Sequence, residues 1–447
     1  MNAVAEALML PGRRRGWAVS WTFKALHGIL NAPEYIFLVA LTAMLFSPPD
    51  LHTFPVDRLA FLALVTVACL RFLLRCDRLE MYSASWPMLG ILALGVWGTL
   101  AQPYDVNAWS ALAARWIVPV VMFHLGGTIF STPGSQRKLE WFSIAVLLYL
   151  SLTAVFWLLH VESLIFPRFI LDEFIGIHPD RARGPFLQAV ANGVCLNVLA
   201  IAALHAWDRQ LPRGAHSSRF PKRGALAALL LVITPLALLA TKTRAVWLGA
   251  ASSAVLLILF GHGRRSRIAA LALILVAAVA ISFAWLVQAR PGELTERLQE
   301  RSPIEFRIEM YRAGWQMFTG KPLLGWGSDA KIQPEIEKRV SSFHPEYYIF
   351  HNTYLEVAVQ HGTVGVLLYV WLFVGLFRVG NRANFPQATR EYPFGAGFGL
   401  MWRIMLCVYL LNASVVVMNY QFLNGYMFTI AGILASQQKA GEVGDRP

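Results

Sequence analysis

Residues 268–287 read IAALALILVAAVAISFAWLV, and residues 225–240 read ALAALLLVITPLALLA. A helix needs about twenty mostly apolar residues to cross the hydrocarbon core of a bilayer. Apolar runs of this kind recur along the chain, since 56% of its 447 residues are hydrophobic and 15% are charged. This composition argues against a soluble globular protein. It predicts an all-α polytopic membrane protein.

Hydropathy predicts about twelve transmembrane helices separated mostly by short connections. The predicted spans begin near Leu30, Leu59, Trp86, Ser110, Trp141, Phe186, Leu226, Val246, Ile268, Thr353, Phe394 and Tyr420. No internal repeat is apparent, and no pair of Gly- or Pro-broken spans recurs in two halves, as it does in many transporters.

Positive charge alternates between the loops. Lys and Arg resist translocation, so loops that stay in the cytoplasm are enriched in them. If Arg13–Arg15 are cytoplasmic, every second loop is basic. These loops contain Arg75 and Arg78, Arg137 and Lys138, Arg209 to Arg223, Arg264 to Arg267, Arg378 to Arg390, and the tail with Lys439 and Arg446. Topology therefore accounts for the net charge of +13 without nucleic acid as a partner.

One predicted non-cytoplasmic loop, between Val287 and His351, has roughly sixty residues and far exceeds an ordinary connection. The chain is accordingly divided into residues 1–287 with spans one to nine, residues 288–350 as a periplasmic loop with interfacial helices, and residues 351–447 with the last three spans and a cytoplasmic tail. Loops of this length tend to be functional.

Within that loop, Pro303–Phe318 has one apolar stripe at helical spacing, which predicts a helix lying in the membrane interface. Arg307 and Arg312 flank the stripe. The helix is predicted to end at a turn in the Gly- and Pro-rich segment Gly320–Gly327.

Arginines occur on the predicted outer side, against the general charge trend. Arg181 and Arg183 precede the span that contains Asn192, Arg244 lies in a tight turn after Thr241, and Arg307 and Arg312 lie in the long loop. A guanidinium binds phosphate through a rigid bidentate fork, so these residues indicate an anionic lipid substrate. Alternatively, an outer arginine reaches only the phosphates of membrane lipids.

A histidine precedes the tenth predicted span, in His351-Asn352-Thr353-Tyr354. Asn352 or Thr353 is expected to cap that helix, and its positive end disfavours imidazolium. A neutral imidazole is the form that a general base requires. His344, in the same loop, is expected to be at most accessory.

Metal and nucleotide chemistry lack sequence support. The four cysteines lie within or beside apolar segments without metal-ligand spacing, and no HExxH motif, outer DxD pair or Walker-type loop occurs. We therefore expect neither a metal nor another cofactor.

Together these motifs resemble the O-antigen ligase and O-antigen polymerase superfamily. The resemblance is strongest in Arg307–Tyr311, Lys321–Gly327 and His351–Leu355, followed by Gly362 and Gly365, and it extends to Arg183-Gly184 with Asn192 and to Thr243-Arg244. Tyr311 stands where the family usually has tryptophan.

The resemblance implies a GT-C-like, inverting, metal-independent glycosyltransferase of the Gram-negative inner membrane. It would transfer a glycan from an undecaprenyl diphosphate carrier to lipid A core on the periplasmic face. His351 would be the base, Arg183 and Arg244 would hold the diphosphate, and the supporting residues would be Arg307, Arg312, Asn352, Tyr354 and Asn192.

Other functions share these motifs. A polymerase would join glycan repeats on the carrier, and a protein O-oligosaccharyltransferase would modify serine or threonine. The basic outer loop and the intermediate length favour the ligase. A non-enzymatic polysaccharide or lipid transporter should instead have polar residues throughout its spans, whereas Glu34, Arg115 and Arg403 lie in or near spans without forming a series. Each of these three could equally belong to an interhelical pair or lie at a span end.

Overall fold

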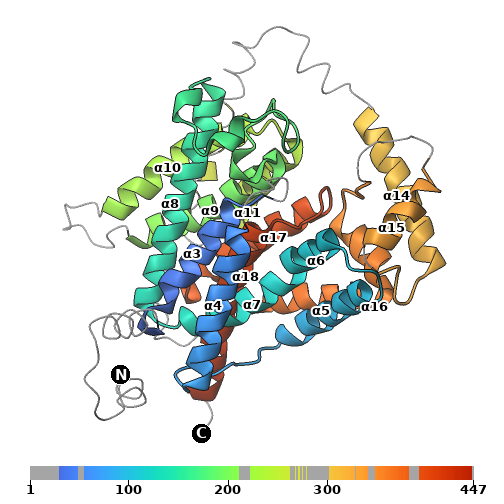
Figure 1. Cartoon of the computed structure of the whole chain (residues 1–447). Coiled ribbons are helices and arrows are strands. Elements are labelled where there is room, and N and C mark those ends of the chain that lie inside the picture. Colours follow the sequence, from blue (N-terminus) through green and yellow to red (C-terminus); the bar gives the residue numbers. More distant parts are fainter. Residues whose placement is uncertain are drawn as a thin grey trace, which may run out of the picture.

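The computed structural model shows a bundle of helices and contains no strand among the residues it describes (Figure 1). The described residues are 30–48, 55–210, 222–261, 267, 270, 271, 274, 278, 302–327, 329–340, 348–381 and 392–444. The predicted all-α class is therefore confirmed for this part of the chain.

Helices lie at the predicted spans, with the exception of the one near Ile268, most of whose residues lie outside the described ranges. They are α3 (Pro33–Leu45), α4 (Val56–Leu73), α5 (Ser85–Leu100), α6 (Val106–Leu112), the π-helical turn η1 (Ala113–Ile117), α7 (Val118–Ile129), α8 (Pro133–Leu158), α9 (Ala189–Gln210), α10 (Lys222–Ala240), α11 (Arg244–Phe260), α16 (Thr353–Val379), α17 (Gly399–Ala413) and α18 (Gln421–Gly444).

Five helical segments of the described residues are long and apolar enough to cross a membrane. They are Val106–Ile129, Pro133–Leu158, Ala189–Arg209, Thr353–Val379 and Ala396–Ala413. Shorter apolar helices include α3, α5 and α11. The membrane character of the chain is thereby supported, and the count of twelve spans stays a prediction.

The centre of the bundle is the close packing of α7 against α18. Glycines allow the two backbones to approach, because a Cβ on Gly432 would lie 1.8 Å from the Phe123 carbonyl oxygen and one on Gly126 would lie 2.8 Å from the Thr429 carbonyl oxygen. Small residues at such contacts are typical of helices packed in membranes, where van der Waals contact drives association.

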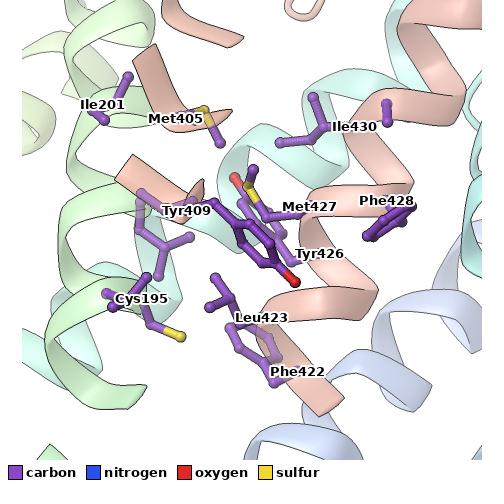
Figure 2. Packing of buried hydrophobic residues seen from close by; sticks show 14 of the residues in the cluster. Cys195, Ile201, Met405, Tyr409, Phe422, Leu423, Tyr426, Met427, Phe428 and Ile430 are labelled. Atoms are coloured by element: carbon purple, nitrogen blue, oxygen red, sulfur yellow. The ribbon is translucent and has the colours of Figure 1, made fainter. Parts of the chain in front are cut away.

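Large apolar and aromatic side chains fill the space between α18 and its neighbours (Figure 2). Phe422 and Tyr426 of α18 stack with 6.2 Å between ring centroids, and the Tyr426 hydroxyl lies 2.8 Å from Ser143 Oγ of α8. Cys195 of α9 and Met405 of α17 belong to the same buried cluster. The buried hydroxyl has a partner, as a polar group in an apolar interior requires.

The long predicted loop contributes two helices, α14 (Ser302–Gly320) and α15 (Asp329–Glu337), which lie together at one side of the bundle, beside α16 (Figure 1). The predicted helix over Pro303–Phe318 is confirmed by α14. One face of α14 is buried through Met310, Ala313 and Met317. Ile308 and Trp315, from the predicted interfacial stripe, are 44% and 61% exposed, whereas Phe318 of the same stripe packs against the buried cluster.

Basic residues from loops predicted to be cytoplasmic pair with acidic residues near the same ends of the spans. Lys138 Nζ lies 2.5 Å from Glu34, Arg209 lies 2.6 Å from Glu140, and Lys439 lies 3.5 Å from Glu80. These contacts join sequence-distant segments that the alternation of charge assigns to the same side. Glu34 thus belongs to an interhelical pair, one of the two explanations that the sequence left open for it.

Candidate functional site

His351 lies immediately before α16, in the position that the sequence predicts. The Asn352 side chain accepts a hydrogen bond from the Leu355 amide at 3.1 Å, so Asn352 is the N-cap. His351 itself has a φ of 51°, a left-handed conformation that is uncommon outside glycine, and the Tyr311 hydroxyl of α14 donates to its carbonyl at 3.4 Å. The histidine therefore occupies a sharp turn held between α14 and α16.

The surroundings of His351 keep its imidazole neutral. Burial, followed by the positive charges of Arg307 and His178, lowers the pKa of His351 from its ordinary value of 6.5 to about 4. Desolvation and neighbouring positive charge both disfavour imidazolium. At neutral pH the ring can thus accept a proton, as a general base must.

Arg307 and Arg312 both lie on α14 and are both exposed. Arg307 is close enough to His351 to affect its pKa, and Phe306 approaches the imidazole edge-on with 6.5 Å between ring centroids. The helix is held against α16 at Gly314, where a Cβ would lie 2.7 Å from Leu355. The packing of α14 on α16 therefore sets the position of Arg307 relative to His351.

The Arg183 side chain is only 2% exposed, and its guanidinium faces the protein backbone. It donates to the carbonyl oxygens of Ile175 at 2.6 Å, Ile170 at 2.9 Å and Asp172 at 2.7 Å. Arg183 thus holds together the loop that precedes α9. In this conformation, binding of a diphosphate by the same nitrogens would require these bonds to exchange.

Asn192 stabilises the other end of that loop. Its side-chain amide, fully buried on α9, donates to the Ala182 carbonyl at 2.9 Å. Gly184 turns with a φ of 58°, and a Cβ there would lie 2.7 Å from Asn192 Oδ1. The pairing of Arg183-Gly184 with Asn192, which the sequence singled out, is therefore a direct contact.

Arg244 has different surroundings, since it is exposed at the first residue of α11. The turn before it is joined to the Arg183 loop by a hydrogen bond of 3.0 Å from the Ala182 amide to the Ala240 carbonyl. The same loop contains His178, which acts on the pKa of His351. One loop thus connects the turn of Arg244 with the neighbourhood of His351.

Tyr354 faces away from this arrangement. Its hydroxyl donates to the Leu410 carbonyl of α17 at 2.7 Å. Thr353, beside it, accepts from the Met418 amide at 3.0 Å and donates to the Val416 carbonyl at 2.8 Å. Tyr354 thus fixes the start of α16 against α17, and Thr353 fixes it against the segment that joins α17 and α18.

The predicted turn segment Lys321–Gly327 inserts into a break in α16. Gly362 has a φ of 63° and a ψ of −162°, which interrupts the helix. The freed backbone groups bond to the turn: the Trp326 amide donates to Val359 at 2.8 Å, and the Thr363 amide donates to Pro322 at 2.7 Å. This turn and the break in α16 form one unit.

A polar group inside the bundle could not be assembled from the sequence. Arg115, in the π-helical turn η1, lies 2.7 Å from the Glu356 carboxylate of α16, and Gln360 donates to the same carboxylate at 3.2 Å. The sequence placed Arg115 in or near a span and left an interhelical pair as one explanation. The only available signal for its partner was that Glu356 also lies in a span, and 241 positions separate the two residues.

Two predictions about the site, the minor role of His344 and the absence of a metal, depend on which residues the structure describes. His344 lies outside the described ranges. Among the residues that the structure describes, no group of three or more His, Cys, Asp or Glu side chains is arranged to hold a metal ion.

A comparison with protein families finds a match within the chain. The family model described as O-antigen ligase matches residues 227–370. This match confirms the predicted relation to the O-antigen ligase superfamily. A comparison with curated proteins finds no match.

The O-antigen ligase match extends from α10 to the middle of α16. It includes Arg244, Arg307, Arg312 and His351, whereas Arg183 and Asn192 precede it. The match indicates a function of the ligase or polymerase type, that is, glycosyl transfer at a membrane.

Proposed function

We propose that the protein is an O-antigen ligase, an inverting glycosyltransferase that uses an undecaprenyl diphosphate-linked glycan as donor and the lipid A core oligosaccharide as acceptor. The reaction would take place on the periplasmic face of the Gram-negative inner membrane. The observation that supports this most directly is the position of His351, immediately before the capped N-terminus of α16, near Arg307 and within the segment that matches the O-antigen ligase family.

In the proposed reaction, a hydroxyl oxygen of the acceptor attacks the anomeric carbon of the donor glycan. Its proton passes to a ring nitrogen of His351, while the bond from the anomeric carbon to the diphosphate oxygen breaks on the opposite face. The electron pair leaves with the lipid diphosphate, and the configuration inverts. Positive charge placed in advance near the leaving group stabilises the negative charge that develops on it.

The two predicted diphosphate-binding arginines are assigned complementary tasks. Arg244 is exposed at a helix N-terminus, where backbone amides also favour an anion, and we assign the direct contact with the diphosphate to it. Arg183 would position the loop next to that site through its three carbonyl contacts. Arg307 and Arg312 would support binding from α14. No step requires a metal ion.

The test is reconstitution of the full chain in vesicles with purified lipid-linked glycan and one of three acceptors. We expect transfer to lipid A core oligosaccharide. Transfer only to a second lipid-linked repeat would reassign the protein as a polymerase, and transfer only to a serine-containing peptide would reassign it as a protein glycosyltransferase. Vesicles that move the glycan lipid across the membrane without forming a new glycosidic bond would support the transporter.

The role of His351 is tested in the same assay. His351→Ala should reduce transfer at least about a hundredfold, because it removes the base, while binding of the lipid-linked donor is retained. His344→Ala should keep most of the activity. A silent His351→Ala together with an inactive His344→Ala would reassign the base.

A further inference from the structure

Two adjacent leucines in the Lys321–Gly327 turn, which follows α14, have exposed apolar side chains. Leu323 is 71% exposed and Leu324 is 61% exposed. Single exposed apolar residues are common on protein surfaces, whereas residues that belong to a contiguous apolar patch mark a contact with a partner or with a membrane. The surroundings of the turn show which contact this is.

The two leucines continue the exposed apolar face of α16. The turn is bonded to that helix, since the Val364 amide donates to the Leu323 carbonyl at 3.3 Å. Beyond this bond, α16 has a series of exposed apolar side chains, namely Val364, Leu367, Val370 and Trp371. Because α16 is long and apolar enough to cross a membrane, this face is the one that lipid covers.

The place of the bond along α16 gives the depth of the leucines. Arg378 lies in the last turn of α16, at the predicted cytoplasmic side, and Val364 precedes it by fourteen positions. At about 1.5 Å per residue, Val364 lies about 21 Å along the helix from Arg378. The hydrocarbon core is about 30 Å thick, and a tilt of the helix would bring Val364 nearer to the cytoplasmic side. Leu323, bonded to Val364, is therefore at the depth of the hydrocarbon.

The order of the hydrogen bonds shows that the turn enters this layer and returns. The Trp326 amide donates to the Val359 carbonyl at 2.8 Å, whereas the Thr363 amide donates to the Pro322 carbonyl at 2.7 Å. Val359 is about one helical turn closer than Thr363 to the start of α16, on the predicted outer side. The deepest part of the segment is thus Pro322–Leu324.

A turn can lie at membrane depth only where its backbone groups have partners inside the protein. The break at Gly362 provides such partners, because the two amides that follow it donate to carbonyl oxygens of the turn. Within the turn, the Gly325 amide donates to the Lys321 carbonyl at 3.2 Å, and Pro322 has no amide hydrogen. The break in α16 and the turn thereby satisfy one another.

The only charged residue of the turn, Lys321, lies where the segment leaves α14. Its Nζ atom is 3.9 Å from the centre of the Trp326 ring, a cation–π contact, and its flexible stem lets the ammonium reach the headgroups. Trp315, six positions earlier on α14, is exposed, and tryptophan concentrates at membrane–water interfaces. Both residues suit a segment that enters the bilayer at this point.

We propose that the Lys321–Gly327 turn is a re-entrant segment of the outer leaflet, in which Leu323 and Leu324 contact lipid acyl chains. The part of the loop that enters the bilayer is then the turn, rather than the predicted apolar stripe of α14, whose Phe318 packs into the protein. The bilayer helps to hold α14, and with it Arg307, beside the start of α16. This membrane contact is independent of the proposed glycosyl transfer.

Fluorescence quenching at a single labelled position tests the contact. In the full chain with its four cysteines replaced, Leu324→Cys is labelled with bimane and reconstituted into phosphatidylcholine vesicles. Acyl chains brominated near their middle quench a fluorophore inside the hydrocarbon, whereas iodide in the buffer quenches a fluorophore in water. Because Leu324 is exposed, its substitution should leave the fold intact, and Leu323→Cys is a second reporter.

Two further positions provide the controls. Leu367→Cys, on the exposed face of α16, reports lipid, and Glu337→Cys, exposed on α15 in the same loop, reports water. We expect the label at position 324 to lose as large a fraction of its fluorescence to brominated lipid as the label at position 367, and to be no more sensitive to iodide. At position 337, iodide should be the stronger quencher.

Two results would overturn the proposal. Quenching at position 324 by iodide but not by brominated lipid would put the turn in water. Weak quenching by both, with normal responses at positions 367 and 337, would mean that another protein surface, such as a second copy of the chain, covers the leucines.

Discussion

At the scale of single residues, the protonation of His351 leads to a specific pH dependence. A base works in its deprotonated form, and the pKa of His351 is about 4 in the free protein. The kcat/KM for transfer should therefore be level from about pH 5 to neutrality and fall as the pH drops through 4, since kcat/KM reports the free enzyme. The measurement is transfer rate against pH at low substrate concentration.

Substitution of Arg307 tests the electrostatic cause of that pH profile. Its charge helps to lower the pKa of His351, so Arg307→Gln should raise this pKa and move the acid limb to higher pH. Arg312→Gln is the control, because it removes a charge from the same helix, and this charge is not among the causes of the pKa shift. The acid limb of its pH profile should stay where it is in the wild type. An acid limb near 6.5 in the wild type would contradict the role of burial at His351.

The two arginines that precede α9 and begin α11 should respond differently to lysine. The Arg183 guanidinium donates to three carbonyl oxygens from two separate nitrogens, whereas a lysine has a single nitrogen and cannot reach the same three positions. Arg183→Lys should therefore lower both the melting temperature and the activity. Arg244→Lys should reduce kcat/KM at least about tenfold without loss of stability, because the charge remains and only the planar fork is lost.

A third arginine serves as the control. Arg168 lies in the same loop, is exposed, and donates to the carbonyls of Glu162 and Ser163. Arg168→Lys should leave melting temperature and activity close to wild type. Full activity of both Arg183→Lys and Arg244→Lys would remove both residues from the proposed mechanism.

At the scale of elements, the sequence predicted helix positions well and helix irregularities poorly. Apolar runs locate α8, α9 and α16 because a bilayer requires a helix wherever such a run occurs. The π-turn at Ala113–Ile117 has no periodic signal. The break in α16 was visible only as Gly362 within an apolar run, because the turn that satisfies its backbone lies about forty residues earlier.

The dependence on contacts between distant segments also explains which features of the candidate site the sequence did not predict. The cap at Asn352 and the helix over Pro303–Phe318 follow from neighbouring residues, and both are confirmed. The burial of Arg183 and the pairing of Arg115 with Glu356 depend on tertiary contacts. A single sequence shows which residues are unusual in a span, but not which of them meet.

The break in α16 can be tested at Gly362. Its conformation is one that essentially only glycine adopts, and a Cβ there would lie 2.3 Å from the Leu323 carbonyl oxygen. Gly362→Ala should lower the free energy of unfolding by about 2–4 kcal/mol, from backbone strain plus overlap, and should displace the Lys321–Gly327 turn. Thermal unfolding and protease sensitivity of that turn are the measurements.

Gly375, in the same helix, is the matched control. A Cβ there would lie 3.7 Å from Ala84, which is ordinary contact, so Gly375→Ala should be neutral. Equal stability of both variants would mean that α16 runs straight through position 362.

At the scale of the whole molecule, contacts between distant segments agree with the predicted sides. Residues assigned to the outer side meet one another: Ala182 bonds to Ala240, Thr353 bonds to Val416, and His178 acts on His351. Residues assigned to the cytoplasm pair separately, as Lys138 does with Glu34. The outer arginines and His351 can share one site only if their loops lie on the same side of the membrane.

Cysteine labelling tests this topology. In a chain whose own cysteines, Cys69, Cys76, Cys195 and Cys407, are replaced, we would place a single cysteine at Glu337 in α15 or at Arg137 in α8, both of which are exposed. A membrane-impermeant maleimide added to intact spheroplasts should modify Glu337→Cys and should reach Arg137→Cys only after permeabilisation. Because α15 and α14 are joined in the loop that precedes His351, labelling at position 337 reports the side on which the proposed base lies. The reverse pattern would put His351 and Arg244 on the cytoplasmic face, where the proposed transfer to lipid A core could not occur.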